Sequence, residues 1–185
     1  METLKALHTR NSASRLIEPA PSKKEMELVY QAAFRAPDHA WLRPWRFIQV
    51  TGESRSKLSD IFLETAQRLK GDISADLEAK YKSASYRAPM VIILISEIKN
   101  HPKVPSIEQI LSVGAATQNM LLALHDLGYG AIWRTGSMAF NETITSVLKL
   151  GENTEVIGYL YVGSKQDELK KLPNLASEDF VSYWE

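Results

Sequence analysis

The segment from Ser106 to Leu127 constrains the fold more than any other part of the chain. Its apolar residues cover much of the circumference of a predicted helix rather than one stripe: Ile110, Leu111, Val113, Met120, Leu121, Leu122 and Leu124. A helix that is apolar on several sides needs several neighbours to cover it. We therefore expect a central, buried helix that ends at Gly128, because glycine commonly follows the last helical turn.

The other predicted elements follow no regular alternation of strand and helix. Helices are expected near 2–8, after the capping box of Ser22 and Glu25, over 54–70, within 71–88, and after Asn141. Strands are expected at 45–51, 90–96, 129–133 and 156–162. This order favours an α+β fold, with several helices around one sheet, over a doubly wound parallel fold. We expect one domain that spans residues 1–185.

The composition excludes several classes of protein. The chain has no cysteine, which rules out thiolate catalysis, Cys-ligated zinc, Fe–S clusters and disulfides. The 22 basic and 22 acidic residues give a formal net charge of zero, so we expect no nucleic-acid partner. The four histidines lack the spacing of a zinc site, and we expect no metal. With no apolar run of membrane length and no signal-peptide pattern at the start, we expect a cytoplasmic protein without a membrane partner.

Common catalytic and nucleotide-binding motifs are missing. The segment Gly128-Tyr129-Gly130-Ala131-Ile132-Trp133 begins like a dinucleotide fingerprint but lacks the third glycine, and it follows a helix and opens a strand. The chain contains neither a Walker A sequence nor a G-x-S-x-G elbow. The sequence therefore offers no residue pair that clearly performs acid–base or nucleophilic catalysis.

Three polar clusters are candidates for ligand binding. Residues 10–15 combine two arginines with two serines, a set that suits a phosphate group. Residues 35–39 place Arg, Asp and His at a proline turn, and residues 128–136 end a predicted strand in Arg134 and Thr135. Each cluster alone has an equally simple structural explanation as a polar loop, a helix end or a strand end.

Taken together, five motifs resemble the nitroreductase family, and most closely a short, minimal subgroup of it. They are Arg10-Asn11-Ser12-Ala13-Ser14-Arg15, Arg35-Ala36-Pro37-Asp38-His39, Arg87-Ala88-Pro89, Lys103-Val104-Pro105 and Trp133-Arg134-Thr135-Gly136. Each motif alone is weak, but their order and spacing agree over nearly the whole chain. The resemblance implies a central, mixed but mostly antiparallel sheet surrounded by helices, and an intertwined homodimer with FMN at the interface.

The resemblance also implies an activity and a set of site residues. The activity is that of an FMN-dependent oxidoreductase that takes hydride from NAD(P)H and reduces nitroaromatic, quinone or related acceptors by a ping-pong mechanism. Within one subunit the FMN-binding residues would be Arg10, Asn11, Ser12, Trp133, Arg134 and Thr135. Arg35 and His39 would reach the flavin from the other subunit. No side chain is expected to be catalytic, because flavin N5 carries the hydride.

Two departures from the longer family members bear on this picture. Those members carry a lysine near flavin N1 and O2 where this chain has Ser14, so another cation must stabilise the reduced flavin or its potential will be lower. They also carry basic C-terminal residues at the phosphate, whereas this tail offers lysines such as Lys165. A non-catalytic flavin carrier or sensor remains an alternative, as does a cofactor-free interaction protein that uses the aromatic tail, residues 180–184.

Overall fold

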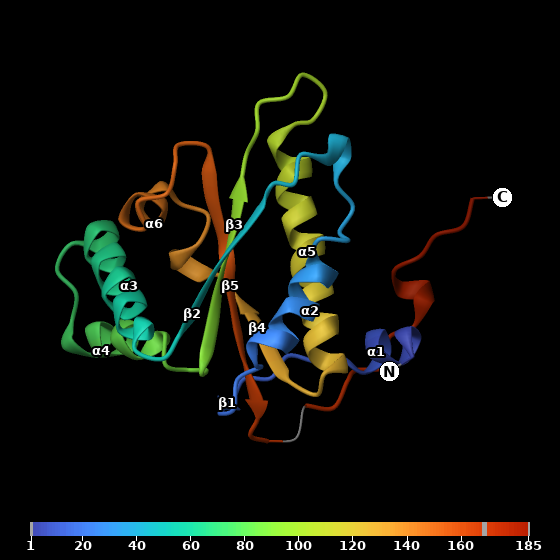
Figure 1. The fold of residues 1–185 in the computed structure, drawn as a ribbon, viewed down its shortest axis with the longest axis horizontal. Helices are drawn as coiled ribbons and strands as arrows, with labels where there is room; N and C mark the ends of the chain where they lie inside the picture. The colour runs from blue at the N-terminus through green and yellow to red at the C-terminus, as the bar shows by residue number, and fades with distance from the viewer. Residues whose placement is uncertain (1, 168–169, 185) are drawn as a thin grey trace.

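One antiparallel sheet forms the centre of the computed structural model, which describes residues 2–167 and 170–184 (Figure 1). Its strands are β1 (Leu16–Ile17), β2 (Trp45–Thr51), β3 (Met90–Glu97), β4 (Gly130–Arg134) and β5 (Thr154–Lys165). One edge of β5 pairs with β3, which pairs with β2, while β4 and β1 pair with the other edge. Every pairing among the described residues is antiparallel, so the predicted α+β class with an antiparallel sheet is confirmed.

Helices cover both faces of this sheet (Figure 1). On one face lie α3 (Ser54–Lys70), α4 (Ala75–Ala84) and α6 (Glu142–Val147), and on the other lie α2 (Lys23–Ala33) and α5 (Ser106–Asp126). Residues 90–96 of β3 are all buried, because a strand between two helical layers has no side that faces water. Two apolar cores result, one on each face of the sheet.

Local signals account for the places where several helices begin. Ser22 and Glu25 form the predicted capping box of α2, with each side chain bonded to the other residue's backbone N–H group. Asn141 accepts a hydrogen bond from the N–H of Ile144 and so caps α6. Three single-turn helices, η1 (His39–Trp41), η2 (Gly136–Met138) and η3 (Ser177–Asp179), and the short N-terminal helix α1 (Thr3–Thr9) complete the described elements.

Helix α5 differs from the prediction on one side. Val113, Met120 and Leu124 are buried, as expected of a central helix. Leu111, however, is 64% exposed, and Ile107, one turn before it, is also exposed. The expected central helix, buried on several sides, is therefore confirmed, but within a single chain the helix keeps one uncovered apolar face.

The C-terminal tail extends away from the sheet (Figure 1). Its last described residues contain four exposed apolar side chains: Phe180, Val181, Tyr183 and Trp184. Trp184 is 99% exposed. Among the described residues, no helix combines the length and the apolar character that crossing a membrane requires.

Candidate functional site

The first predicted cluster lies in the loop between α1 and β1. Arg10 directly follows α1, and its N–H donates to the carbonyl of Ala6. Asn11 Nδ2 donates to the carbonyl of Lys170 at 2.6 Å, and Asn11 Oδ1 accepts from the N–H of Ser12 at 2.8 Å. Arg10 and Asn11 are half-buried, while Ser12 is exposed. The C-terminal tail thus holds this loop in place through Asn11.

Arg10 shares its surroundings with a second cation and a histidine. His125, in the last turn of α5, lies 2.8 Å from Thr9 Oγ1 through its Nε2 atom. Burial lowers the pKa of His125, and the positive charges of Lys165 and Arg10 lower it further. Both basic side chains lie near this imidazole, and Lys165 also packs at Gly130 beside the loop that contains Ala13, so this end of the site has the charge that a phosphate group requires.

Strand β4 connects this cationic end to the third predicted cluster. At its first residue, a Cβ on Gly130 would lie 2.8–2.9 Å from atoms of Leu16, Ala13 and Lys165, so only glycine lets the loop approach this closely. The N–H of Ala13 donates to the carbonyl of Ala131 at 3.1 Å. From Gly130 the strand runs roughly 13 Å to Arg134, given a rise of about 3.4 Å per residue.

A cavity of about 260 Å³ lies beyond the end of β4. Arg134 and Thr135 line it, together with Arg87 from the connection between α4 and β3. The guanidinium carbon of Arg134 lies 5.8 Å from the ring centroid of Tyr161. Burial raises the pKa of the Tyr161 hydroxyl, and the charges of Arg87 and Arg134 partly oppose that rise. The Nε atom of Arg134 is buried and has no hydrogen-bond partner among the described residues.

The side chain of Trp133 lies on the opposite face of β4 from this cavity. Its Nε1 atom donates to the carbonyl of Ile157 at 3.2 Å, and its ring packs in the core that contains α5. A Cβ on Gly158, whose φ is +143°, would lie 2.2 Å from that Nε1 atom. The indole therefore anchors β4 to the core. That Trp133 binds a flavin stays a prediction, and any such contact would be made by its backbone atoms.

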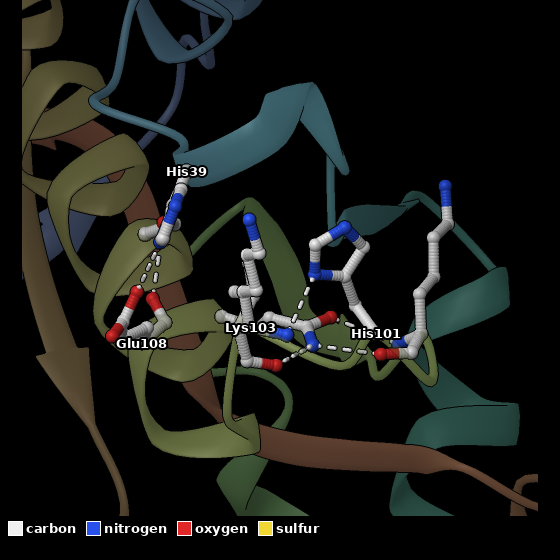
Figure 2. Close-up of polar contacts among 8 residues, drawn as sticks. His39, His101, Lys103 and Glu108 are labelled. Carbon is white, nitrogen blue, oxygen red and sulfur yellow. Dashed lines mark hydrogen bonds and ion pairs between the residues drawn. The ribbon is translucent and has the colours of Figure 1, made fainter.

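The second predicted cluster lies at the other end of α5. His39 Nδ1 is 2.7 Å from Glu108 Oε2 in the first turn of that helix, and Figure 2 shows the two side chains facing each other. Arg35, four residues before His39, lines a separate hollow of about 290 Å³. Glu108 and His125 are separated by roughly 25 Å at 1.5 Å per residue. His39 is thus far from Arg10 in the same chain.

Comparison with known proteins agrees with this architecture. The family model of the nitroreductase family matches residues 9–164 of this chain. The chain belongs to the nitroreductase family. It is 33% identical over 185 residues to the protein named "Putative NAD(P)H nitroreductase YdjA" of Escherichia coli (strain K12), and the match covers 100% of both chains.

Solved structures of nitroreductases have the same fold. The nitroreductase-like family protein of Bacillus cereus superimposes with a TM-score of 0.85 at 19% identity, covering 100% of this chain and 97% of that one. A nitroreductase of Bacteroides fragilis with bound FMN superimposes with a TM-score of 0.75 at 21% identity, covering 100% of both. The predicted nitroreductase-like fold and the assignment to an oxidoreductase family are therefore confirmed.

The structure adds residues for which the sequence indicated no role in the site. Arg87 belongs to one of the five motifs, but only the fold brings it to the same cavity as Arg134. Lys80 and Tyr161 line that cavity too, and neither is part of the five motifs. The position of Tyr161 in a buried strand gave no sign that its ring would lie beside Arg134 in a cavity that Arg87 also lines. The roles of the eight predicted FMN-binding residues stay predictions.

Proposed function

We propose that this nitroreductase-family protein is a cytoplasmic, FMN-dependent oxidoreductase that takes hydride from NAD(P)H and passes it to nitroaromatic, quinone or related acceptors by a ping-pong mechanism. The observation that carries the proposal is the pair of cationic sites joined by β4, one at Arg10 and Lys165, the other at Arg134 and Arg87. The printed name of YdjA includes NAD(P)H, and the Bacteroides fragilis structure contains FMN.

The residues at these two sites fit the two ends of FMN. Arg10, with Lys165 beside it, would hold the phosphate, because a guanidinium group pairs with phosphate oxygens in bidentate fashion. Asn11 and Ser12 would bind the ribityl chain. Arg134 and Thr135 would contact the ring, and the buried Nε–H of Arg134 would gain the acceptor that it lacks among the described residues.

The flavin supplies the redox chemistry when bound, by accepting hydride at N5 and passing it on. The chain's own residues then have three tasks: to bind the cofactor, to fix the orientation of its ring, and to leave one ring face open to the donor and the acceptor. None of these tasks requires an acid–base dyad. The proposal thus agrees with the lack of any clear catalytic pair in the sequence.

The position of Arg35 and His39 supports a homodimer. Arg10 lies beside the last turn of α5 and His39 beside its first turn, roughly 25 Å apart along the helix, so a flavin whose phosphate is held at Arg10 would have that phosphate far from His39 of the same chain. Two chains related by a two-fold axis can bring both sets of predicted FMN-binding residues to one flavin, if Arg10 of one subunit and the Arg35–His39 segment of the other subunit lie beside it. The uncovered face of α5, at Ile107 and Leu111, provides apolar surface for such a contact.

The C-terminal tail fits the same assembly. An apolar groove of about 700 Å³ runs along the edge strand β2 and helix α2, and Tyr30, Phe34 and Phe47 contribute to its lining. The lining of this groove includes none of the described tail residues, whose aromatic side chains are exposed. We assign the groove to the second copy, whose Phe180, Tyr183 and Trp184 supply matching aromatic surface.

The test is an absorption spectrum of freshly purified protein, followed by anaerobic addition of NADH and, separately, NADPH. We expect an oxidised-flavin band that bleaches with at least one donor and returns when a nitroaromatic or quinone is added. A flavin band that persists with both donors would contradict the reductase and support a carrier or sensor. A spectrum without flavin, even after incubation with FMN, would overturn the cofactor assignment itself.

A further inference from the structure

We propose that Arg87 and Arg134 act as a pair that binds the edge of the flavin ring on which negative charge gathers during reduction, and that this pair raises the reduction potential. This inference rests on the proposed function and deepens it. It assigns a role to Arg87 and gives Arg134 a task beyond binding the cofactor.

The two arginines reach one cavity from different parts of the chain. Arg87 precedes the buried strand β3, whereas Arg134 is the last residue of β4. Both line the cavity, and both lie close enough to the hydroxyl of Tyr161 to influence its pKa. The fold therefore brings two cations near one aromatic residue, at the end of the strand that begins beside Arg10.

The charge of this cavity is strongly one-sided. Its twelve lining residues include Arg87, Arg134 and Lys80, and none of the twelve carries a carboxylate. Among the described residues, no salt bridge joins either arginine to an acidic side chain. Lys80 and Arg87 are exposed and Arg134 is half-buried, so the three cations repel one another moderately, and a bound anion would remove that repulsion. The cavity is thus best suited to a ligand that carries negative charge.

The unpartnered Nε atom of Arg134 indicates which kind of ligand atom the cavity could bind. Arg134 Nε is buried without an acceptor, and such a donor costs folding free energy. A ring carbonyl or ring nitrogen of a bound flavin would supply the acceptor. The bond becomes stronger when that acceptor is charged, since hydrogen bonds with an ionised partner are shorter and stronger than neutral ones.

Reduction of a flavin by hydride provides that charge. Hydride brings two electrons and one proton, so the donor leaves as NAD(P)⁺ and the ring system gains one negative charge at its N1 and O2 edge. Ser14 is neutral at the position from which longer family members supply a lysine to this edge. In this chain, Arg87 and Arg134 provide the positive charge from different positions in the sequence.

The experiment measures the midpoint potential of bound FMN by anaerobic dye equilibration in the wild type, Arg87→Gln, Arg134→Gln and the charge-keeping Arg87→Lys. The affinity for oxidised FMN is measured separately by quenching of flavin fluorescence. We expect each Gln variant to lose at least tenfold more affinity for reduced than for oxidised FMN. For a two-electron couple this tenfold difference is a fall of about 30 mV in potential. Arg87→Lys should keep a potential near that of the wild type.

The matched control is Lys82→Gln, which removes one positive charge from the exposed pair of Lys82 with Glu78 on α4, outside the cavity. Its potential should equal that of the wild type. Equal losses of oxidised and reduced FMN in both Gln variants would overturn the inference, because they would indicate a purely structural role. Wild-type protein that binds no FMN would instead overturn the proposed function, so the two failures are distinguishable.

Discussion

At the scale of single residues, Arg10 is the most direct test of the phosphate end. Replacing Arg10 by Ala removes one charged hydrogen-bond donor, and we expect FMN binding to weaken by about 1.5–3 kcal/mol. Titration of apoprotein with FMN, followed by fluorescence, measures the change. The control is Arg15→Ala in the same loop, which breaks only an exposed 3.3 Å pair with Asp167 and should leave the affinity near that of the wild type. Unchanged binding in Arg10→Ala would remove Arg10 from the site.

Gly158 is a second residue for which the structure predicts a clear effect of substitution on stability. Gly158→Ala adds a methyl group against Trp133 Nε1 at a φ of +143°, so we expect a loss of about 2–5 kcal/mol in the free energy of unfolding. Urea denaturation followed by tryptophan fluorescence measures the loss. The matched control is Gly151→Ala, where an added Cβ meets nothing within 4 Å, and it should change stability by about 0.5 kcal/mol or less. Equal stability of the two variants would contradict the packing described at Trp133.

At the scale of elements, we expect the stability of the start of helix α2 to depend on pH. Hydrogen bonds from the side chain and backbone of Ser22, and then from Tyr129, lower the pKa of Glu25 below its usual 4.5. A lowered pKa in the folded state gives stability that is present above the unfolded-state pKa and disappears as the pH falls through the folded-state value. We expect wild type to exceed Glu25→Gln in unfolding free energy at neutral pH. The difference should vanish below the folded-state pKa of Glu25.

Urea denaturation of both proteins over a series of pH values measures this difference. Gln preserves the capping geometry, so the comparison isolates the charge of Glu25. A difference that stays constant from neutral to acidic pH would show that the carboxylate charge contributes nothing to the helix start.

Element positions were predictable from sequence wherever the signal was local. The strand at 45–51 and the helix at 54–70 have the predicted bounds, because alternation, periodicity and flanking polar residues determine both. Strand β1 was missed, since two residues are too short for any periodicity. Strand β5 was predicted too short, because its ends, at Thr154 and Lys165, extend only by pairing with β3 and β1. Pairing of that kind depends on distant segments, which no local pattern reports.

The site was predictable only in part, for a similar reason. The loop at Arg10 and the strand end at Arg134 were found because each combines several polar groups within a few residues. The meeting of Arg87 with Arg134, and of Lys165 with Arg10, depends on the sheet register, which brings residues far apart in sequence to one place. The resemblance to a known family indicated which clusters belong together, but it gave no role to Arg87.

At the scale of the whole molecule, the uncovered face of α5 predicts assembly. Leu111→Lys places a charge on an apolar surface that we assign to the dimer interface. Because the dimer is two-fold symmetric, the interface then contains two such charges. We expect the dissociation constant of the dimer to rise at least tenfold, equivalent to about 1.4 kcal/mol, and bound FMN to be lost with it. Sedimentation across a range of concentrations measures this, with Leu111→Met as the control. A Lys variant that remains as dimeric as the Met variant would exclude this face from the interface.

Mixed dimers test the shared site directly. Arg10→Ala and Arg35→Ala chains should each bind FMN poorly when alone. If Arg10 of one subunit and Arg35 of the other meet at the same flavin, unfolding and refolding an equal mixture creates dimers with one intact site, and about one quarter of all sites should recover. Flavin content after gel filtration measures the recovery. Recovery of no sites would mean that both arginines serve the same flavin from the same chain.

The contact between Trp133 and Gly158 also has a consequence for how such a sequence can change over time. While the indole is present, position 158 accepts no side chain, whatever its chemistry. A smaller residue at position 133 would remove the clash with the indole but not the one with the carbonyl oxygen of Arg134, which would lie 2.8 Å from the same Cβ. Position 158 is therefore held at glycine by the backbone as well as by the indole, so substitutions at position 133 alone open no new choices there.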